Sequence, residues 1–396
     1  MDSLGYFKHL VILHTRKSCI FGQFLLFNIH SNFNTAVKDS DPNQVEVNFL
    51  IEEILKCFNN EQYEFFKVQT NFIESLTNIS RDLLKYDKNR REAGLKLIKN
   101  VKIPERVFLP TDPNCLIHSI NLKSIRPMKS AAKSPYLIEF YLKNVGYETV
   151  EKYCTDKSFN LNLDDFPTES KRFIIKYGDD LRQDMLAIQF MKLLMKIYSY
   201  FNFDLYTYPY SIVATGYECG IIECIPNSSS IDDLLSQSLS LVAHLISSHG
   251  DIKSLEMEQV RLNFINSHAC GIIINYFLQL KDRHNGNIMV DTQGNYYHID
   301  FGYVLGMTPG FSVENQIKYD PQTRNVFNDI NSDTYGDEYQ VYFEMAVVKG
   351  IYGLKYYMPH IKRLVAAMDG CPLPCFPNNN AEIPANKLIK LYFYQF

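Results

Sequence analysis

The sequence predicts an α+β protein in which a β-rich part is followed by a mainly helical part. Short β-rich runs separated by Pro, Ser, Asn and Asp follow Pro104, whereas apolar residues recur at helical spacing beyond about residue 230. The length agrees with this division, because 396 residues suffice for two or three domains or for one large two-lobed unit. We therefore expect a two-lobed α+β architecture.

The elements follow from the period of the apolar residues. In the first helical block, Ile51, Ile54, Leu55 and Phe58 recur at the i, i+3, i+4 and i+7 positions of a helix. Further along the same block, Phe72, Ile73 and Leu76 have a similar spacing. Residues 1–40 show no clear period and remain unassigned. The predicted parts are an unassigned segment at 1–40, a helical segment at 41–103, a β-rich lobe at 104–226 and a mainly α lobe at 227–396. Strands are predicted at 107–109, 136–141, 173–176, 211–215 and 220–225, and helices at 182–200, 231–247, 257–279 and 340–358.

Composition excludes several classes of protein. With 46% hydrophobic and 21% charged residues the chain is neither disordered nor fibrous. A net charge of -4 excludes wholesale electrostatic binding of nucleic acid, so we expect no nucleic-acid partner. The nine cysteines are scattered and odd in number, which favours reduced, packed thiols over a disulfide framework. No apolar run reaches the roughly 18 residues that span a membrane, and no signal peptide is expected.

The densest chemical signal is the run Lys-Asp-Arg-His-Asn-Gly-Asn at 281–287, followed by two apolar runs and an Asp-Phe-Gly at 300–302. A turn at 293–295 predicts a β-hairpin between them, which returns Asn287 and Asp300 to one edge, where they can share a Mg²⁺ ion. In protein kinases an equivalent Asn and Asp bind the metal while another loop side chain handles the proton of the nucleophile. Asp282 and His284 are the two candidates. Turn capping alone would explain a lone Asp-Phe-Gly, but not this combination.

A second signal lies where a predicted strand meets the helix at 182–200. Lys176 ends the strand, and Asp184 lies in the first turn of the helix. A strand-borne Lys can reach a phosphate, and an acidic residue on the next helix can hold its ammonium. The alternative is a helix N-terminus at which Asp179 and Asp180 favour the macrodipole, and the two interpretations are compatible.

A third stretch, at 127–135, joins two predicted strands with small residues and two lysines. Small side chains let backbone N–H groups approach phosphate oxygens, and Lys adds charge. A solvated basic turn has the same composition, so only the position of this stretch in the order of motifs favours a phosphate-binding loop.

The runs Lys-Tyr-Gly-Asp-Asp-Leu-Arg-Gln-Asp-Met at 176–185, Lys-Asp-Arg-His-Asn-Gly-Asn-Ile-Met at 281–289 and His-Ile-Asp-Phe-Gly at 298–302 resemble the signature of the phosphatidylinositol 3- and 4-kinase superfamily. The stretches at 109–113, 128–137 and 213–226 resemble most the type III alpha phosphatidylinositol 4-kinases. The likeness runs from about residue 60 to 376. It implies a two-lobed, protein-kinase-like lipid kinase fold that uses ATP and Mg²⁺, with Mn²⁺ as an alternative metal.

The resemblance assigns roles to individual residues. Catalysis would involve Asp282, His284 and Lys176, and Asn287 and Asp300 would bind the metal. The nucleotide would be bound by Ser130 and Lys133 in the phosphate loop, by Lys176 with Asp184 orienting it, by Tyr210 deep in the pocket, and by backbone groups at Glu223 and Ile225, which resemble the adenine-binding hinge.

The resemblance also predicts the substrate. A bisphosphorylated headgroup calls for a basic cluster after Asp-Phe-Gly, whereas residues 303–320 carry only Glu314, Lys318 and Asp320 as charged groups. We therefore expect transfer of the ATP γ-phosphate to the 4-hydroxyl of unphosphorylated phosphatidylinositol. The alternatives are a phosphatidylinositol 3-kinase that takes the same lipid, a catalytically impaired nucleotide-binding scaffold and, less favoured, a protein kinase of the related branch.

The sequence departs from the family pattern in two places. Residues 317–336 lack the usual double glycine, and the chain ends at Phe396, which leaves the C-terminal part shorter than in the family. From the resemblance we expect phosphatidylinositol in membranes as substrate, a membrane-targeting adaptor protein as partner, and a cytoplasmic location, peripheral on the cytosolic face of membranes.

Overall fold

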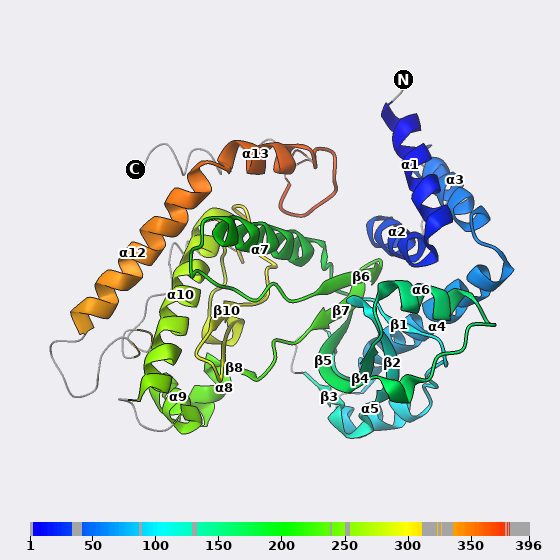
Figure 1. Ribbon diagram of the computed structural model, residues 1–396. Coiled ribbons are helices and arrows are strands. Elements are labelled where there is room, and N and C mark those ends of the chain that lie inside the picture. Colours follow the sequence, from blue (N-terminus) through cyan, green and yellow to red (C-terminus); the bar gives the residue numbers. More distant parts are fainter. Residues whose placement is uncertain are drawn as a thin grey trace. The chain divides into compact units, whose positions relative to one another are not determined.

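A computed structural model describes residues 3–33, 42–86, 89–128, 133–237, 240–249, 254–310 and 336–376, together with 323, 326, 378 and 380. The chain divides into two compact units, one made of Met1–Arg182 and Tyr210–Cys224 and the other of Gln183–Pro209 and Ile225–Phe396. Both helices and sheets are present, which confirms the predicted α+β class (Figure 1). The helix that begins at Arg182 groups with the second unit, although residues 182–200 fall within the range that the sequence assigns to the β-rich lobe.

In its described residues, the first unit combines α-helices with one antiparallel sheet. Its helices are α1 (Ser3–Lys17), α2 (Cys19–Asn32), α3 (Pro42–Lys56), α4 (Asn60–Leu83), α5 (Arg90–Lys99) and α6 (Tyr147–Thr155). Its strands are β1 (Phe108–Leu109), β2 (Asp112–Ile120), β3 (Arg126–Pro127), β4 (Tyr136–Asn144), β5 (Thr168–Tyr177), β6 (Ile212–Gly216) and β7 (Cys219–Glu223). They run in the order β1-β2-β4-β5-β7-β6, and β3 pairs with the end of β4.

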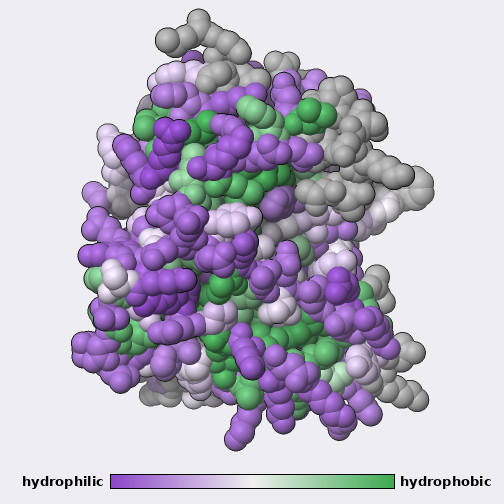
Figure 2. All heavy atoms as spheres, turned by 90° about the vertical axis from the view of Figure 1, so that its right-hand side faces the viewer, coloured by the Kyte–Doolittle hydropathy of each residue, from purple (hydrophilic) through white to green (hydrophobic). Residues whose placement is uncertain are grey.

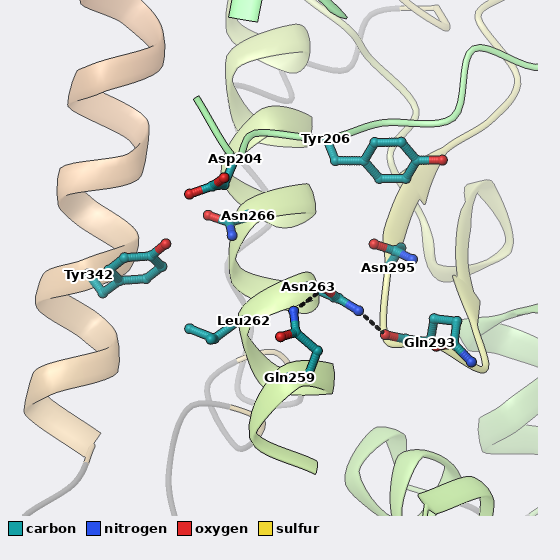
Figure 3. Close-up of a pocket in the computed structure, with 9 residues that line it drawn as sticks. All are labelled: Asp204, Tyr206, Gln259, Leu262, Asn263, Asn266, Gln293, Asn295 and Tyr342. Atoms are coloured by element: carbon teal, nitrogen blue, oxygen red, sulfur yellow. Dashed lines mark hydrogen bonds between the residues drawn. The ribbon is translucent and has the colours of Figure 1, made fainter. Parts of the chain in front are cut away.

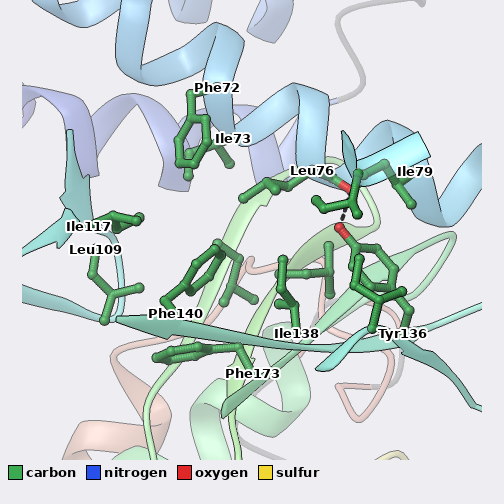
Figure 4. Packing of buried hydrophobic residues seen from close by; sticks show 14 of the residues in the cluster. Phe72, Ile73, Leu76, Ile79, Leu109, Ile117, Tyr136, Ile138, Phe140 and Phe173 are labelled. Carbon is green, nitrogen blue, oxygen red and sulfur yellow. Dashed lines mark hydrogen bonds between the residues drawn. The ribbon is translucent and has the colours of Figure 1, made fainter. Parts of the chain in front are cut away.

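Helix α4 covers one face of this sheet and forms the core of the unit. The apolar residues predicted to share a helix face, Phe72, Ile73 and Leu76, are buried against strands β2 and β4 (Figure 4). Tyr136 on β4 donates its hydroxyl hydrogen bond to the carbonyl of Leu76 at 2.8 Å, so the buried phenol is satisfied. A capping box at Asn59 fixes the start of the helix. The helix therefore has a defined rotation over the sheet.

Residues 3–32, which the sequence left unassigned, form α1 and α2. Helix α2 is apolar on several sides and is buried between its neighbours, so it shows no amphipathic period. Ser18 caps it by accepting a hydrogen bond from Phe21 N–H at 3.0 Å. The carboxylate of Glu151 on α6 accepts hydrogen bonds from the N–H groups of Cys19 and Ile20, where an anion complements the helix dipole.

Strand β2 and helix α6 were also not predicted from the sequence. Strand β2 has three consecutive buried residues in the middle, because Cys115 and Ile117 pack into one hydrophobic cluster and Leu116 packs into another, so both faces of the strand are covered and no apolar–polar alternation is seen. Helix α6 is short and follows Gly146, whose φ of 82° is a conformation that other residues rarely adopt.

The second unit is mainly helical in its described residues. Its elements are α7 (Arg182–Tyr200), β8 (Ser228–Ser230), α8 (Ile231–Ser236), α9 (Leu241–His249), α10 (Leu255–Leu278), the 3₁₀ turn η3 (Asn285–Asn287), β9 (Ile288–Asp291), β10 (Tyr296–His298), α12 (Gly336–Lys355) and α13 (Met358–Ala366). The single helix predicted at 231–247 is wrong: α8 ends near Gln237, and Ser240 starts a new helix by accepting a hydrogen bond from Ala243 N–H at 3.1 Å.

Figure 2 shows hydrophilic side chains over most of the face that lies on the right of Figure 1, with hydrophobic side chains gathered in patches between them. Within the described part of the chain, no helix is both long enough and apolar enough to cross a membrane.

The packing of α4 on the sheet yields a prediction of stability. Gln69 is fully buried, and its amide donates to the carbonyl of Phe108 at 2.9 Å while accepting from the Phe108 N–H at 3.2 Å. Gln69→Leu removes both partners of a buried peptide group and should lower the free energy of unfolding by about 3 kcal/mol, measured by urea denaturation. Glu64→Leu, on the exposed side of the same helix, should change it by less than about 0.5 kcal/mol. Equal effects of the two substitutions would contradict this account.

Candidate active site

The β9–β10 hairpin brings the two predicted metal ligands to one edge of the second unit. Strands β9 and β10 pair antiparallel with Ile288 opposite His298, which confirms the predicted hairpin. Just beyond this pair, the N–H of Ile299 donates to the carbonyl of Asn287 at 3.1 Å. Asn287 and Asp300 are therefore held at the same end of the hairpin by backbone hydrogen bonds.

The donor set at this end suits a hard cation. The Asn287 side-chain amide donates to the carbonyl of Asp282 at 2.9 Å, which leaves its Oδ1 as the atom that can bind a ligand. Asp300 is exposed and has a φ of 61°. One amide and one carboxylate oxygen are ligands that Mg²⁺ accepts when phosphate and water complete its shell. Among the described residues there is no group of three or more His, Cys, Asp or Glu that could hold a metal, but a site of this kind requires none.

His284 starts the 3₁₀ turn η3, and its side chain caps that turn. The Nδ1 atom accepts a hydrogen bond from the N–H of Gly286 at 3.1 Å. A backbone N–H can only donate, so Nδ1 carries no proton and the neutral ring has its hydrogen on Nε2. In this arrangement the outer face of the exposed imidazole offers a hydrogen-bond donor.

Arg283 organises the loop, and sequence reasoning did not single it out. Its guanidinium is buried and donates to the carbonyls of Lys281 at 2.9 Å, of Ile299 at 2.8 Å and of Asp300. It thereby joins the loop before the hairpin to the segment after it. The sequence did contain a signal for this role. Arg283 lies between the two candidate residues Asp282 and His284, and an Arg side chain that is buried in a folded loop needs hydrogen-bond acceptors or an acidic partner.

The first turn of α7 fixes the Asp-Phe-Gly segment from another side. Asp184 accepts a hydrogen bond from the N–H of Phe301 at 2.9 Å, and the Gln183 amide donates to the carbonyl of Gly302 at 3.0 Å. The Phe301 side chain is fully buried. The carboxylate of Asp184, predicted to orient Lys176, thus has a contact within its own unit that holds the backbone next to Asp300.

The second histidine near this site has a structural role. His298 on β10 is buried, and burial lowers its pKa well below the usual value, with the charge of Arg283 acting in the same direction. The ring is therefore neutral at physiological pH. Because His298 is enclosed, it is no candidate for proton transfer, in contrast to the exposed His284.

In the first unit, Lys133 and Lys176 meet at one carboxylate. Lys176 Nζ lies 3.4 Å from Asp179 Oδ2, and Lys133 Nζ contacts Asp179 Oδ1. The N–H of Asp179 donates to the carbonyl of Glu218 at 2.8 Å, which fixes the turn after β5. Two ammonium groups that converge beside a strand end form a positive site that an anion such as a phosphate can enter.

The neighbouring carboxylate has a different partner. Arg182 donates to the two oxygens of Asp180 at 2.8 and 2.7 Å. Burial alone would raise the pKa of Asp180, but the hydrogen bonds from the Arg182 side chain and backbone outweigh it and hold that pKa below its usual value. Asp180 is thereby engaged locally, while Asp179 faces the two lysines.

The predicted phosphate loop lies partly outside the described residues, which omit 129–132. Ser130 lies outside the described residues. The base of the loop is closed by a hydrogen bond from Met128 N–H to the carbonyl of Pro135 at 2.8 Å, and Ser80 on α4 donates to the carbonyl of Ser134 at 2.8 Å. The end of the loop that carries Lys133 is therefore anchored to α4.

The predicted hinge lies at the end of β7. The N–H of Glu223 donates to the carbonyl of Ser211 at 2.9 Å, and its carboxylate accepts from the Ser211 N–H at 3.0 Å. The N–H of Glu223 is therefore already used within the unit. That of Ile225 donates no hydrogen bond among the described residues, and Tyr210 is buried.

A polar cavity of about 620 Å³ lies at the opposite end of the hairpin, and none of the predicted site residues lines it (Figure 3). Gln259 donates to Asn263 at 3.0 Å, and Asn263 donates to the carbonyl of Gln293 at 2.9 Å, so the side-chain amides on α10 are tied to the hairpin turn. The lining residues are Asp204, Tyr206, Gln259, Leu262, Asn263, Asn266, Gln293, Asn295 and Tyr342.

The contacts of Arg283 predict a measurable loss of local order in a variant. Arg283→Lys keeps the charge but replaces three nitrogen donors, each aimed at a different carbonyl, with a single nitrogen, and the loss of about 2 kcal/mol should make the amides of Ile299 and Phe301 exchange about thirtyfold faster. Hydrogen exchange followed by mass spectrometry measures this. Arg363→Lys, on the exposed side of α13, serves as the control and should leave exchange unchanged. If these amides exchange at the wild-type rate in Arg283→Lys, the guanidinium does not hold the segment.

Comparison with known proteins supports the sequence signature. Residues 170–348 match the model of the family described as phosphatidylinositol 3- and 4-kinase. The chain is 30% identical over 385 residues to phosphatidylinositol 4-kinase STT4 of Saccharomyces cerevisiae, covering 95% of this chain and 20% of that protein. It is 32% identical over 370 residues to a putative phosphatidylinositol 4-kinase alpha-like protein P2 of Homo sapiens, covering 84% and 62%.

A third relative, phosphatidylinositol 4-kinase alpha 2 of Arabidopsis thaliana, is 30% identical over 371 residues, covering 91% of this chain and 66% of the relative. The chain spans about a fifth of the length of the yeast kinase and about two thirds of the plant one. The catalytic domain of this family has the protein-kinase-like fold that the sequence predicts. The chain belongs to the phosphatidylinositol 3- and 4-kinase family, and it is similar over most of its length to the alpha 4-kinases.

Proposed function

We propose that the protein is a lipid kinase that transfers the γ-phosphate of ATP to the 4-hydroxyl of phosphatidylinositol. The observation that carries this proposal is the hairpin end at which Asn287 and Asp300 adjoin the loop of Asp282 and His284. The names of the relatives that match most of the chain support the same reaction. Phosphoryl transfer requires mainly positioning and charge stabilisation, and rigid backbone ties provide positioning.

In this proposal the first unit binds the nucleotide. Lys133 and Lys176 would exchange their shared contact with Asp179 for phosphate oxygens, since a phosphate offers more acceptors and more charge than one carboxylate. Adenine would bind the backbone near Glu223 and Ile225 beside the buried Tyr210. A role for Ser130 in the loop and the orientation of Lys176 by Asp184 stay predictions from the resemblance.

The metal would be Mg²⁺, with Mn²⁺ as an alternative, held by Asn287 Oδ1 and the Asp300 carboxylate. A cation there supplies charge stabilisation to the transferring phosphoryl group. The chain's own contribution is to keep the two ligands aligned. Arg283 fixes the carbonyl of Asp300, and Asp184 fixes the next N–H, so the Asp300 carboxylate projects from a backbone held on both sides.

The contacts of His284 bear on which residue takes the proton of the lipid hydroxyl. With Nδ1 occupied by the Gly286 N–H, the imidazole is oriented as a donor that stabilises charge. We therefore assign the base to Asp282, whose carboxylate needs no change of tautomer to accept a proton.

The choice of lipid rests on the sequence, because Glu314, Lys318 and Asp320 lie outside the described residues. Scarcity of cations in that segment favours unphosphorylated phosphatidylinositol. The proposal places the chain peripherally on the cytosolic face of a membrane, recruited there by an adaptor protein.

A radiolabelled ATP assay with phosphatidylinositol vesicles tests the proposed function, and chromatography of the headgroup identifies the labelled position. We expect label at the 4-position. Asp300→Ala should reduce turnover by at least about a thousandfold through loss of the metal ligand, whereas Asp164→Ala, an exposed carboxylate in the first unit, should not. Label at the 3-position would support the 3-kinase alternative. Binding of ATP and Mg²⁺ without lipid product would support the scaffold.

A pair of amide substitutions separates the two candidate bases. His284→Asn preserves a cap for η3 and a donor but offers no base, so turnover should fall by less than about tenfold. Asp282→Asn keeps the shape at a φ of 60° but removes the proton acceptor, and turnover should fall by at least about a hundredfold. Single-turnover kinetics at saturating ATP measures both. The reverse order of effects would make His284 the base.

A further inference from the structure

Five basic side chains gather on the first unit where helix α5 packs on the 3₁₀ turn η1 (Leu122–Ser124) and on strand β3. All five are exposed, and none of them forms an ion pair with a residue that the structure describes. They are here called the α5 basic surface. Its residues are Arg91, Lys96 and Lys99 on α5, Lys123 on η1 and Arg126 on β3.

Close packing holds the two segments of this surface together. A Cβ at Gly94 on α5 would lie 3.0 Å from a methyl of Ile125, the residue between η1 and β3, and Ile125 is fully buried. A larger side chain at Gly94 would push the helix away from the sheet. Helix α5 contacts both η1 and β3 (Figure 1). The cations on the helix and those on the turn and strand therefore border one surface.

Few acids oppose these cations. Glu92 is exposed on the same side of α5, so the described surface carries five cations against one acid. Two acids on the bordering elements have partners of their own. Asp82 on α4 accepts a hydrogen bond from Lys85 at 2.8 Å, and Glu139 on β4 accepts one from Asn121 at 2.6 Å. In a chain of net charge -4, this surface is a local concentration of positive charge.

The sequence around η1 and β3 strengthens this contrast. Residues 113–138 contain no Asp or Glu. The exposed Glu105, which follows the segment after α5, acts on Tyr153 of α6, and α6 packs on β2. The cations on η1 and β3 therefore lack an acid from their own segment.

Two exposed apolar side chains stand among these cations. Leu122 is 42% exposed and precedes Lys123, and Met128 is 39% exposed and follows Arg126 by two positions. At the surface of a bilayer, such apolar side chains enter the boundary of the acyl chains while Lys and Arg stay with the phosphates. An acidic peptide would neutralise the cations but offers the two apolar side chains no apolar phase.

We propose that the α5 basic surface docks the protein on an anionic membrane, with its five cations at the lipid phosphates and with Leu122 and Met128 at the boundary of the acyl chains. Every Lys or Arg near an anionic bilayer adds to the attraction, and salt screens it. The inference rests on the proposed function only in that a lipid substrate gives a membrane-docking surface its purpose.

Vesicle sedimentation without ATP tests the proposal on the whole chain. Vesicles of phosphatidylcholine with about 30% phosphatidylserine should bind the protein at least about tenfold more tightly than phosphatidylcholine alone, and about 0.5 M salt should remove most of that difference. Lys96→Glu combined with Lys99→Glu, and separately Lys123→Glu combined with Arg126→Glu, should each weaken the binding at least about tenfold. Glu92→Gln removes the opposing charge and should strengthen the binding about threefold.

Lys192→Glu combined with Lys196→Glu on α7 is the matched control. Both lysines are exposed and lie four positions apart on a helix of the second unit, and their reversal changes the net charge by the same amount. Binding should stay within about twofold of wild type. A loss as large as that of the α5 pair would show that binding follows the net charge of the chain, and it would overturn the proposal. Wild-type protein that binds neither vesicle would also overturn it.

Poly-glutamate tests the other occupant, an acidic protein. Leu122→Ser combined with Met128→Ser should weaken binding to the anionic vesicles at least about threefold, because apolar burial in the bilayer is lost. The same pair should leave binding to poly-glutamate unchanged. If wild-type protein binds poly-glutamate as tightly as the vesicles, and the apolar pair has no effect on vesicle binding, the surface docks an acidic protein and the choice of a membrane is overturned.

A soluble short-chain phosphatidylinositol separates this inference from the proposed function. Lys96→Glu combined with Lys99→Glu should keep wild-type turnover on the soluble lipid while losing turnover on vesicles, because only the vesicles require docking. Wild-type protein that binds anionic vesicles but phosphorylates neither form of the lipid would leave the docking surface supported and the proposed function contradicted.

Discussion

The buried guanidinium of Arg283 is the contact on which the candidate active site depends. The segments before and after the β9–β10 hairpin are irregular backbone, and their carbonyls need donors when they are enclosed. Arg283 donates to three of them, from Lys281 to Asp300. A charged donor bound to neutral carbonyls is stronger than an ordinary amide contact, so one side chain ties both ends of the site together.

In the first unit, too, one side chain holds several groups, because the Asp179 carboxylate contacts both Lys133 and Lys176. The carboxylate keeps two ammonium groups together and compensates their repulsion. Its neighbour Asp180 is held instead by Arg182, so that two adjacent acids have separate partners. The turn after β5 thus arranges positive charge for an incoming anion without leaving any of these acids unpaired.

Much of this could be predicted from the chain because the relevant signals are local. The hairpin follows from two apolar runs around a Gly-containing turn, and α4 from the spacing of Phe72, Ile73 and Leu76. The motif at 281–287 could be interpreted because its residue types suit one chemistry. The helices in residues 3–32 were not predicted because α2 is buried on several sides, and β2 was not predicted because both of its faces are covered at Cys115, Leu116 and Ile117.

The sequence by itself determined the α+β class and the order of the elements, because these depend on composition and on short-range periodicity, and its motifs indicated the side chains proposed for phosphoryl transfer. Only the tertiary structure decided which atoms these side chains contact. Asp184 accepts a hydrogen bond from the N–H of Phe301, Arg283 donates to three carbonyls, and the glycines of α12 pack closely on Ile273 and Phe203. Such contacts join residues that are far apart along the chain, and no local pattern encodes them.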